Sequence, residues 1–345
     1  MILPRGNLTR HNVMELWLFD FCNFRCGYCG LVENGDVTKH EQLDPYRDLN
    51  YVDQLVRFFR ENRPSNRPLA VTLTGGEPLF MPNIDYFTTE LAKLGDTIAI
   101  YSNLSIPLGK ALSETAIDAV SYLEASFHPD WHMGKLKKEV FFNNVLEVKK
   151  LGVPVLVRFV GAPQLLDQLT ELEERCQEIG VTFMPTTLFN VNYPKNYTQD
   201  EKDYLSSYMV GYSSLIQLDG GMDVSDKKCL AADRLYAARL HKGGDVTPCI
   251  STMTPVLGNI FENKLKSISG PNKCFKSDKL CTCDIHFQQN LVSDADDSQE
   301  FELILQGKAN KLAPTYSEWK LENKVQTKNS QWLVKVLLFK TYRSY

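Results

Sequence analysis

Three cysteines stand close together near the N-terminus, in the segment FDFCNFRCGYCG. Cys22, Cys26 and Cys29 are separated by three and two residues, so one loop can present three thiolates to an iron–sulfur cluster or a zinc ion. Three local ligands leave one metal position open for a substrate or cofactor, whereas a closed structural site needs a fourth ligand from elsewhere. The spacing predicts metal chemistry and favours an open site.

The other cysteines do not indicate a disulfide framework. The chain has nine cysteines, an odd number, and no N-terminal secretory signal, which predicts a reducing, cytoplasmic location. Cys176 is in register with the apolar stripe of a helical pattern that includes Leu169 and Leu172, so we expect it to be a packed small hydrophobe.

A second polar segment, VTLTGGEPLF, places Gly75, Gly76, Glu77 and Pro78 at the end of a predicted strand. Glycines let a backbone approach a ligand closely, and a carboxylate accepts hydrogen bonds from an ammonium group. A Gly-Gly-Pro sequence alone is usually only a turn, so this segment gains its meaning from the cysteines one strand earlier.

Together, CNFRCGYC and GGEP resemble the CxxxCxxC and GGEP motifs of the radical S-adenosylmethionine (SAM) enzymes. The resemblance implies that the three cysteines bind a [4Fe–4S] cluster whose unique iron is chelated by SAM. It also implies reductive cleavage of SAM to a 5′-deoxyadenosyl radical, hydrogen abstraction from a substrate, and an external electron donor such as flavodoxin or ferredoxin.

The resemblance also implies roles for residues at the cofactor. Tyr28 would lie beside the adenine, and the GGEP segment would hold the amino group of SAM. Ser102 and Asn103, in AIYSNLS, resemble the pair that contacts the ribose, although a simple strand-end turn is the alternative. Two further candidates are Ser126, as a cavity residue, and Arg158, whose burial calls for an anion such as the methionine carboxylate.

The segment SFHPDWH carries two histidines, His128 and His132, at the i, i+4 spacing of helical metal ligands. Pro129 argues against an uninterrupted helix there, which favours ordinary loop residues. Because the segment follows the carboxyl end of a strand, His128 and Asp130 are candidate substrate-facing catalytic residues.

Alternating strand and helix patterns position these motifs. Six βα repeats imply parallel strands with helical crossovers, and so an α/β barrel or an open doubly wound sheet. The resemblance implies the former, a partial (β/α)6 TIM-like barrel over residues 1–190. The predicted strands are 14–19, 69–74, 96–101, 119–126, 153–160 and 181–185. The predicted helices are 48–61, 83–94, 110–118, 140–151 and 164–179.

The remaining cysteines lie in a segment of different character, 229–290, after a connector and a helix at 191–228. HKGGDVTPC reads as a hairpin. The segment resembles the SPASM and twitch extensions, which implies one auxiliary [4Fe–4S] cluster. Five cysteines are candidates for four ligand positions, with the first two the surest: Cys229, Cys249, Cys274, Cys281 and Cys283. A structural zinc ribbon is the alternative, and residues 291–345 form an extension of unknown role.

Charge and hydropathy restrict the partners. The chain has 345 residues, with 38 basic and 42 acidic side chains and a net charge of −4, so nucleic acid is not indicated, and no apolar run is long enough for a membrane span. Only 21 residues precede Cys22, which leaves no room for a leader-binding domain and favours oxidation or rearrangement of a small biosynthetic intermediate such as a sugar or aminocyclitol. The alternatives are a maturase acting on a ribosomal peptide and, more remotely, a noncatalytic iron–sulfur or zinc scaffold, against which the GGEP segment argues.

Overall fold

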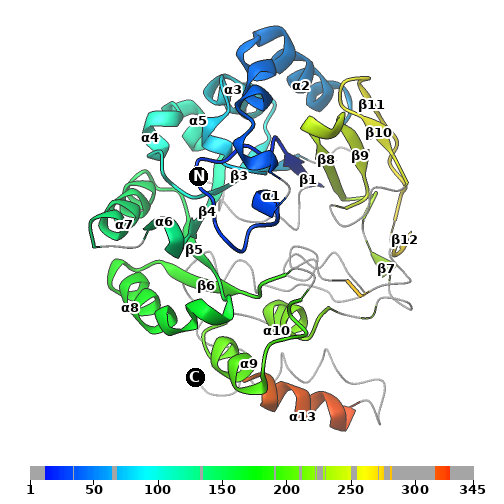
Figure 1. Cartoon of the computed structure of the whole chain (residues 1–345). Helices are drawn as coiled ribbons and strands as arrows, with labels where there is room; N and C mark the ends of the chain where they lie inside the picture. The colour runs from blue at the N-terminus through cyan, green and yellow to red at the C-terminus, as the bar shows by residue number, and fades with distance from the viewer. Residues whose placement is uncertain are drawn as a thin grey trace, which may run out of the picture.

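A curved sheet of parallel strands forms the centre of the molecule (Figure 1). The computed structural model describes residues 12–33, 35–63, 68–132, 135–189, 192–209, 212–221, 223, 228–229, 231–249, 255–270, 272–275, 280–281 and 315–326. Six consecutive strands pair in sequence order and in parallel, which confirms the expected α/β fold. They are β1 (Asn12–Trp17), β2 (Leu69–Thr74), β3 (Thr97–Ser102), β4 (Val120–Phe127), β5 (Val155–Val160) and β6 (Thr182–Thr186).

Helices cover the convex face of this sheet (Figure 1). Their bounds are α2 (Leu49–Glu61), α3 (Ile84–Lys93), α4 (Leu108–Ala111), α5 (Glu114–Asp118), α7 (Lys135–Lys150) and α8 (Leu169–Ile179). The single helix expected at 110–118 is two helices, because Leu112 adopts an extended conformation after α4. The helix expected at 164–179 begins as the 3-10 helix η5 (Pro163–Gln168).

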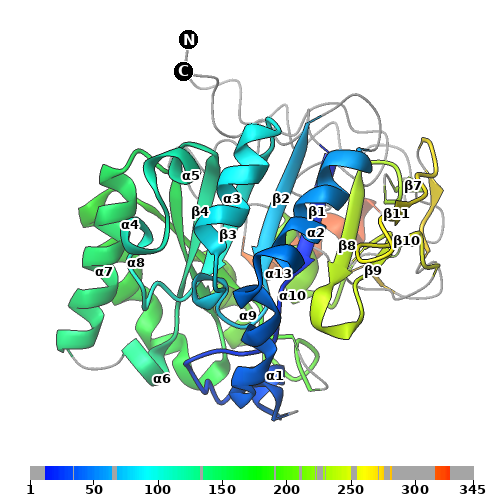
Figure 2. The ribbon, with the colours of Figure 1, turned by 90° about the horizontal axis from the view of Figure 1, so that it is seen from above.

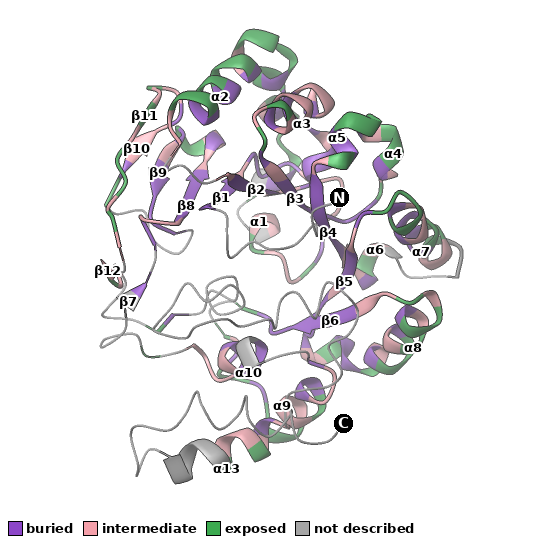
Figure 3. Ribbon diagram, turned by 180° about the vertical axis from the view of Figure 1, so that it is seen from behind, coloured by how far each residue is buried: buried purple, intermediate pink, exposed green. Residues whose placement is uncertain are grey.

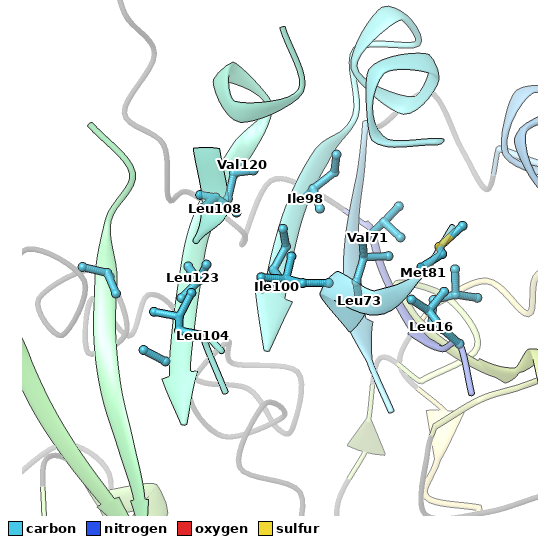
Figure 4. Packing of buried hydrophobic residues seen from close by; sticks show 14 of the residues in the cluster. Leu16, Val71, Leu73, Met81, Ile98, Ile100, Leu104, Leu108, Val120 and Leu123 are labelled. Carbon is cyan, nitrogen blue, oxygen red and sulfur yellow. The ribbon is translucent and has the colours of Figure 1, made fainter. Parts of the chain in front are cut away.

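The strands β1 to β4 are largely buried (Figure 3), and their aliphatic side chains fill the layer between sheet and helices (Figure 4). Each strand alternates its faces, so one set of residues packs under the helices and the other set faces the concave side of the sheet. On β4, for instance, Leu123 lies in the helix-covered core, whereas Tyr122 and Glu124 belong to the opposite face.

The sheet continues beyond β1 into the segment expected to form a separate domain. The strand β8 (Leu235–Arg239) pairs in parallel with β1, in the register Val13↔Leu235 and Trp17↔Arg239. The predicted hairpin is present: β9 (Asp245–Thr247) returns antiparallel to β8 after Gly243 and Gly244, both with positive φ, and short strands β10 (Gly258–Asn259) and β11 (Lys264–Leu265) follow.

Shorter elements complete the described chain. Those in the first half are α1 (Gly30–Glu33), η2 (Asp36–Thr38), η3 (His40–Arg47), η4 (Pro78–Phe80) and α6 (Pro129–His132). Those in the second half are α9 (Gln199–Ser206), α10 (Tyr212–Leu218), β7 (Lys228–Cys229), η6 (Leu240–Lys242), β12 (Asn272–Lys273) and α13 (Tyr316–Gln326). The helices α9 and α10 stand where one helix was expected within 191–228. Within the described residues, no helix combines the length and apolar character needed to cross a bilayer.

Candidate functional site

A cavity of about 330 Å³ lies at the carboxyl ends of the parallel strands. Its lining includes the cysteine loop after β1, the GGEP segment after β2, and polar residues at the ends of β3 and β4. In Figure 2, α1 and α6, which follow β1 and β4, lie at the same end of the sheet. Loops that follow parallel strands gather at this end, where α/β barrels bind their ligands.

The cysteine loop brings its three thiols into one electrostatic neighbourhood. The Sγ atom of Cys22 accepts a hydrogen bond from the amide of Phe24 at 3.3 Å and a weaker one from Asn103 Nδ2 at 3.7 Å. Burial, with smaller contributions from neighbouring thiols, raises the pKa of Cys22 to about 11 and that of Cys26 to about 12. A bound metal cation would offset this cost, since it stabilises thiolates over thiols.

The donor set fits an iron–sulfur cluster with one open position, since a single loop supplies three sulfurs that face a cavity. Among the described residues, no three cysteine, histidine or carboxylate side chains are close enough together to hold a metal ion as they stand. A [4Fe–4S] cluster bonds each thiolate to a different iron atom, so its three ligands need not surround a single ion.

The two glycines of GGEP are required by the backbone that leads into the cysteine loop. A Cβ on Gly76 would lie 1.8 Å from the carbonyl oxygen of Phe21, and one on Gly75 would lie 2.3 Å from that of Phe19. The Gly76 amide donates to the carbonyl oxygen of Phe19 at 2.7 Å, and the Glu77 amide donates to that of Phe21 at 2.9 Å. Both glycines also line the cavity, so their expected close approach to a ligand stays a prediction.

Glu77 is fully buried and accepts three hydrogen bonds. Ser102 Oγ and the Leu79 amide donate to Oε1 at 2.7 and 3.1 Å, and the Asn103 amide donates to Oε2 at 2.7 Å. Burial raises the pKa of Glu77 to about 7, although these three donors act in the opposite direction. Ser102 and Asn103 thus contact Glu77 directly, and their expected contact with a ribose stays a prediction.

Arg158 forms a bidentate ion pair with Glu124 on the neighbouring strand, at 2.5 Å (Nε to Oε1) and 2.6 Å (Nη2 to Oε2). Both side chains are largely buried, and Glu124 lines the cavity. The buried guanidinium of Arg158 therefore has a carboxylate partner within the chain. The expected contact of Arg158 with a cofactor carboxylate stays a prediction. Ser126, two residues beyond Glu124, also lines the cavity.

The segment after β4 packs against the cysteine loop. His128 Nδ1 shares a hydrogen bond of 2.8 Å with the phenol of Tyr28, and the Gly27 amide donates to Asp130 Oδ2 at 2.9 Å. Burial lowers the pKa of His128 to about 4, against the opposing charge of Asp130, so the imidazole is neutral near pH 7. The side chain of His132 lies outside the described residues.

Sequence reasoning missed Asp20, which joins the N-terminal motif to the hairpin. Its carboxylate accepts from Trp17 Nε1 at 2.8 Å and lies 2.9 Å from His241 Nε2. Burial would raise the pKa of Asp20, but contacts with His241, Trp17 and Lys242 outweigh it and hold that pKa below its usual range. Asp20 was missed because its partner His241 is more than two hundred residues away in the sequence. Glu124 could have been found, because Tyr122, Glu124 and Ser126 alternate along β4 and therefore share one face of the sheet.

The C-terminal cysteines form a second group of neighbouring thiols. Burial raises the pKa of Cys229 to about 12, and Cys274, Cys281 and Cys249 all add to that rise. The pairing of β7 with β12 sets Cys229 opposite Asn272, two residues before Cys274. Cys283 lies outside the described residues. Cys176, in contrast, is fully buried in the core on α8, which confirms its expected packing role.

Comparisons with known proteins agree with this site. The model of the radical SAM superfamily matches residues 18–176. Two curated relatives are GTP 3′,8-cyclases. The one from Aquifex aeolicus (strain VF5) is 28% identical over 182 residues, 49% of this chain and 54% of its own length. The one from Alkaliphilus metalliredigens (strain QYMF) is 29% identical over 123 residues, 34% of this chain and 36% of its own.

Among solved structures, Streptococcus suis SuiB has a TM-score of 0.50 at 16% identity, covering 74% of this chain and 64% of SuiB. That likeness concerns the fold. The chain spans about half the length of the first curated relative and about a third of the second.

The fold and the site define a parallel-stranded α/β barrel with its cavity under a three-cysteine loop. Residues 18–176 resemble a radical SAM superfamily domain, and both curated relatives are named as enzymes.

Proposed function

We propose that the chain is a radical SAM enzyme that acts on a small biosynthetic intermediate. Cys22, Cys26 and Cys29 would hold a [4Fe–4S] cluster, with SAM in the adjoining cavity. Cluster and SAM together supply a 5′-deoxyadenosyl radical, which abstracts a hydrogen atom from a substrate carbon. The observation that carries the proposal is the convergence of the three thiols and the buried Glu77 on one cavity at the strand ends.

Residues of the chain would orient the cofactor. Glu77 accepts three hydrogen bonds, and a carboxylate has about four acceptor sites, so one remains for an ammonium group. Tyr28 lines the cavity with its hydroxyl held by His128, which leaves its ring to contact the adenine. Arg158 pairs with Glu124, which lines the cavity, and we place the methionine carboxylate near this pair.

The test is anaerobic reconstitution with iron and sulfide, followed by incubation with SAM and a strong reductant. We expect 5′-deoxyadenosine, and replacement of Cys22, Cys26 or Cys29 by Ala should abolish it. Flavodoxin or ferredoxin should substitute for the chemical reductant. Absence of 5′-deoxyadenosine from protein with an intact cluster would contradict the proposal and favour a noncatalytic scaffold.

We further propose an auxiliary [4Fe–4S] cluster at the C-terminal cysteines, which would accept an electron from the substrate or anchor it. The electrostatic influence of Cys249, Cys274 and Cys281 on Cys229 supports these four as candidate ligands, beside Cys283, which lies outside the described residues. Two clusters correspond to about eight iron atoms per chain. A zinc ribbon would instead give about four iron atoms and one zinc.

The substrate assignment rests on two considerations. Two curated relatives are named GTP 3′,8-cyclase, which makes a nucleotide a further small-molecule candidate beside sugars and aminocyclitols. A peptide is the second candidate, because Phe189, 40% exposed, lines the cavity and offers an apolar contact for an extended chain. Incubation with GTP, with candidate sugars and with a peptide encoded nearby in the genome would distinguish them by substrate loss. We also propose a cytoplasmic location, because a reducing compartment suits cysteines that serve as metal ligands.

A further inference from the structure

The four residues that follow β4, His128 to Trp131, contact the cysteine loop at three points. His128 shares its hydrogen bond with Tyr28, and Asp130 accepts from the Gly27 amide. The rings of Trp131 and Phe24 stack, with centroids 5.1 Å apart and planes 3° from parallel. All three contacts join residues about one hundred positions apart in the sequence.

These contacts fall between the cysteines. Phe24 stands in the interval between Cys22 and Cys26, whereas Gly27 and Tyr28 occupy the interval between Cys26 and Cys29. Both intervals of the loop are thus attached to the same short segment. None of the three contacts uses a thiol, so all three remain compatible with thiolates that bind a metal.

We propose that His128, Asp130 and Trp131 form a clamp that holds the cysteine loop in its metal-binding conformation, with Asp130 as a positioning residue. The proposal rests on the assignment of Cys22, Cys26 and Cys29 as cluster ligands. It gives His128 and Asp130 a different role from the substrate-facing one that the sequence suggested.

The physical argument is one of conformational freedom. A [4Fe–4S] cluster bonds each thiolate to a different iron atom, so the loop must hold its three thiols in a fixed relative arrangement. Ordering a loop that is free to move costs conformational entropy. A segment fixed to the end of β4 removes much of that freedom beforehand, and the Gly27–Asp130 contact is a charge-assisted hydrogen bond.

The experiment compares variants of Asp130 in the full-length, reconstituted protein. The rate of iron loss to a chelator is measured under anaerobic conditions without SAM, so the readout is independent of turnover. Asp130→Ala removes the acceptor for the Gly27 amide, and we expect iron loss about threefold to tenfold faster. Asp130→Asn keeps an oxygen acceptor, so its rate should stay close to that of the wild type.

The matched control is Asp85→Ala. Asp85 Oδ1 also accepts a backbone hydrogen bond, from Ser113 at 2.7 Å, but it does not line the cavity. The Asp85→Ala variant should therefore lose iron at the same rate as the wild type. A rate for Asp130→Ala equal to that of the wild type, an equal acceleration in Asp85→Ala, or failure of Asp130→Asn to restore the rate would each overturn the clamp. A wild-type protein that assembles no cluster would instead refute the proposed function.

A double-mutant cycle tests the second contact. Tyr28→Phe and His128→Phe each remove one partner of the shared hydrogen bond. If the clamp holds the loop through this bond, the double variant should lose iron no faster than the faster single variant. Multiplication of the two single effects would show that the residues act separately and would overturn this part of the clamp.

Discussion

Glu124 and Arg158 form a bidentate ion pair between adjacent strands, inside the concave face of the sheet. The guanidinium places Nε and Nη2 at 2.5 and 2.6 Å from the two carboxylate oxygens, and the side chains are 7% and 13% exposed. Two charges so far removed from water depend on each other, because each would otherwise be buried without compensation.

Removal of one partner should therefore destabilise the protein more than removal of both. We expect Glu124→Gln or Arg158→Gln to lower the free energy of unfolding by about 3 kcal/mol. The double variant should lose clearly less than the sum of the two single variants, because no uncompensated charge remains. Chemical denaturation, monitored by circular dichroism, gives the free energy of unfolding of the wild type, the two single variants and the double variant. Strictly additive losses would contradict a coupled pair.

Glu77 should make the stability of the metal-free protein depend on pH. Its folded-state pKa is about 7, raised by burial above the ordinary value of 4.5. The folded protein therefore holds this proton more tightly than the unfolded chain, and the stabilising contribution present below pH 4.5 is lost as the pH rises through 7. The total is up to about 3 kcal/mol.

The measurement compares wild type with Glu77→Gln at pH 5.5 and pH 7.5. Asp96, whose pKa burial raises to about 6, contributes with the same sign in both proteins, so the difference between them isolates Glu77. We expect the wild type to lose more stability between the two pH values than the variant does. Equal losses would show that the ionisation of Glu77 is not coupled to folding.

Local sequence patterns were sufficient for the motifs and for the presence of six parallel strands. The three cysteines share one loop, and GGEP is four consecutive residues, so their spacing can be recognised without any tertiary information. Strand periodicity located β2 correctly at 69–74, while β1 begins two residues earlier than expected, at Asn12. Helix ends were less certain because capping and turn geometry decide them.

Contacts between distant parts of the chain could not be predicted. The parallel pairing of β8 with β1, the contact of Asp20 with His241, and the hydrogen bond from Gly27 to Asp130 all join residues about one hundred or more positions apart. No local pattern encodes such a pairing, since the hydrophobic period of a strand says which face is buried but not which strand lies beside it. A lone arginine at position 158 indicated a buried anion, but the sequence could not identify Glu124.

Gly76 should tolerate no side chain. Its Cβ position lies 1.8 Å from the carbonyl oxygen of Phe21, and this contact is with backbone, which cannot rotate away. We expect Gly76→Ala to displace the backbone that leads to Cys22, with loss of iron binding and a lower melting temperature. Gly30→Ala is the control, because nothing lies within 4 Å of its Cβ position and its φ is not positive. If both variants bind iron like the wild type, the close packing of GGEP on β1 is wrong.

Replacement of a ligand cysteine and replacement of a packed cysteine should have different effects on the iron content of the reconstituted protein. Cys176 is fully buried on α8 among apolar side chains, whereas Cys229 has three other thiols in its electrostatic neighbourhood. After reconstitution, Cys229→Ala should retain about half of the iron of the wild type, since only the auxiliary cluster is lost. Cys176→Ala should retain all of it, with a destabilisation of about 1 kcal/mol from the lost packing. Iron and protein assays on the same samples measure the ratio. Full iron content in Cys229→Ala would remove Cys229 from the ligand set, and reduced iron in Cys176→Ala would contradict its packing role.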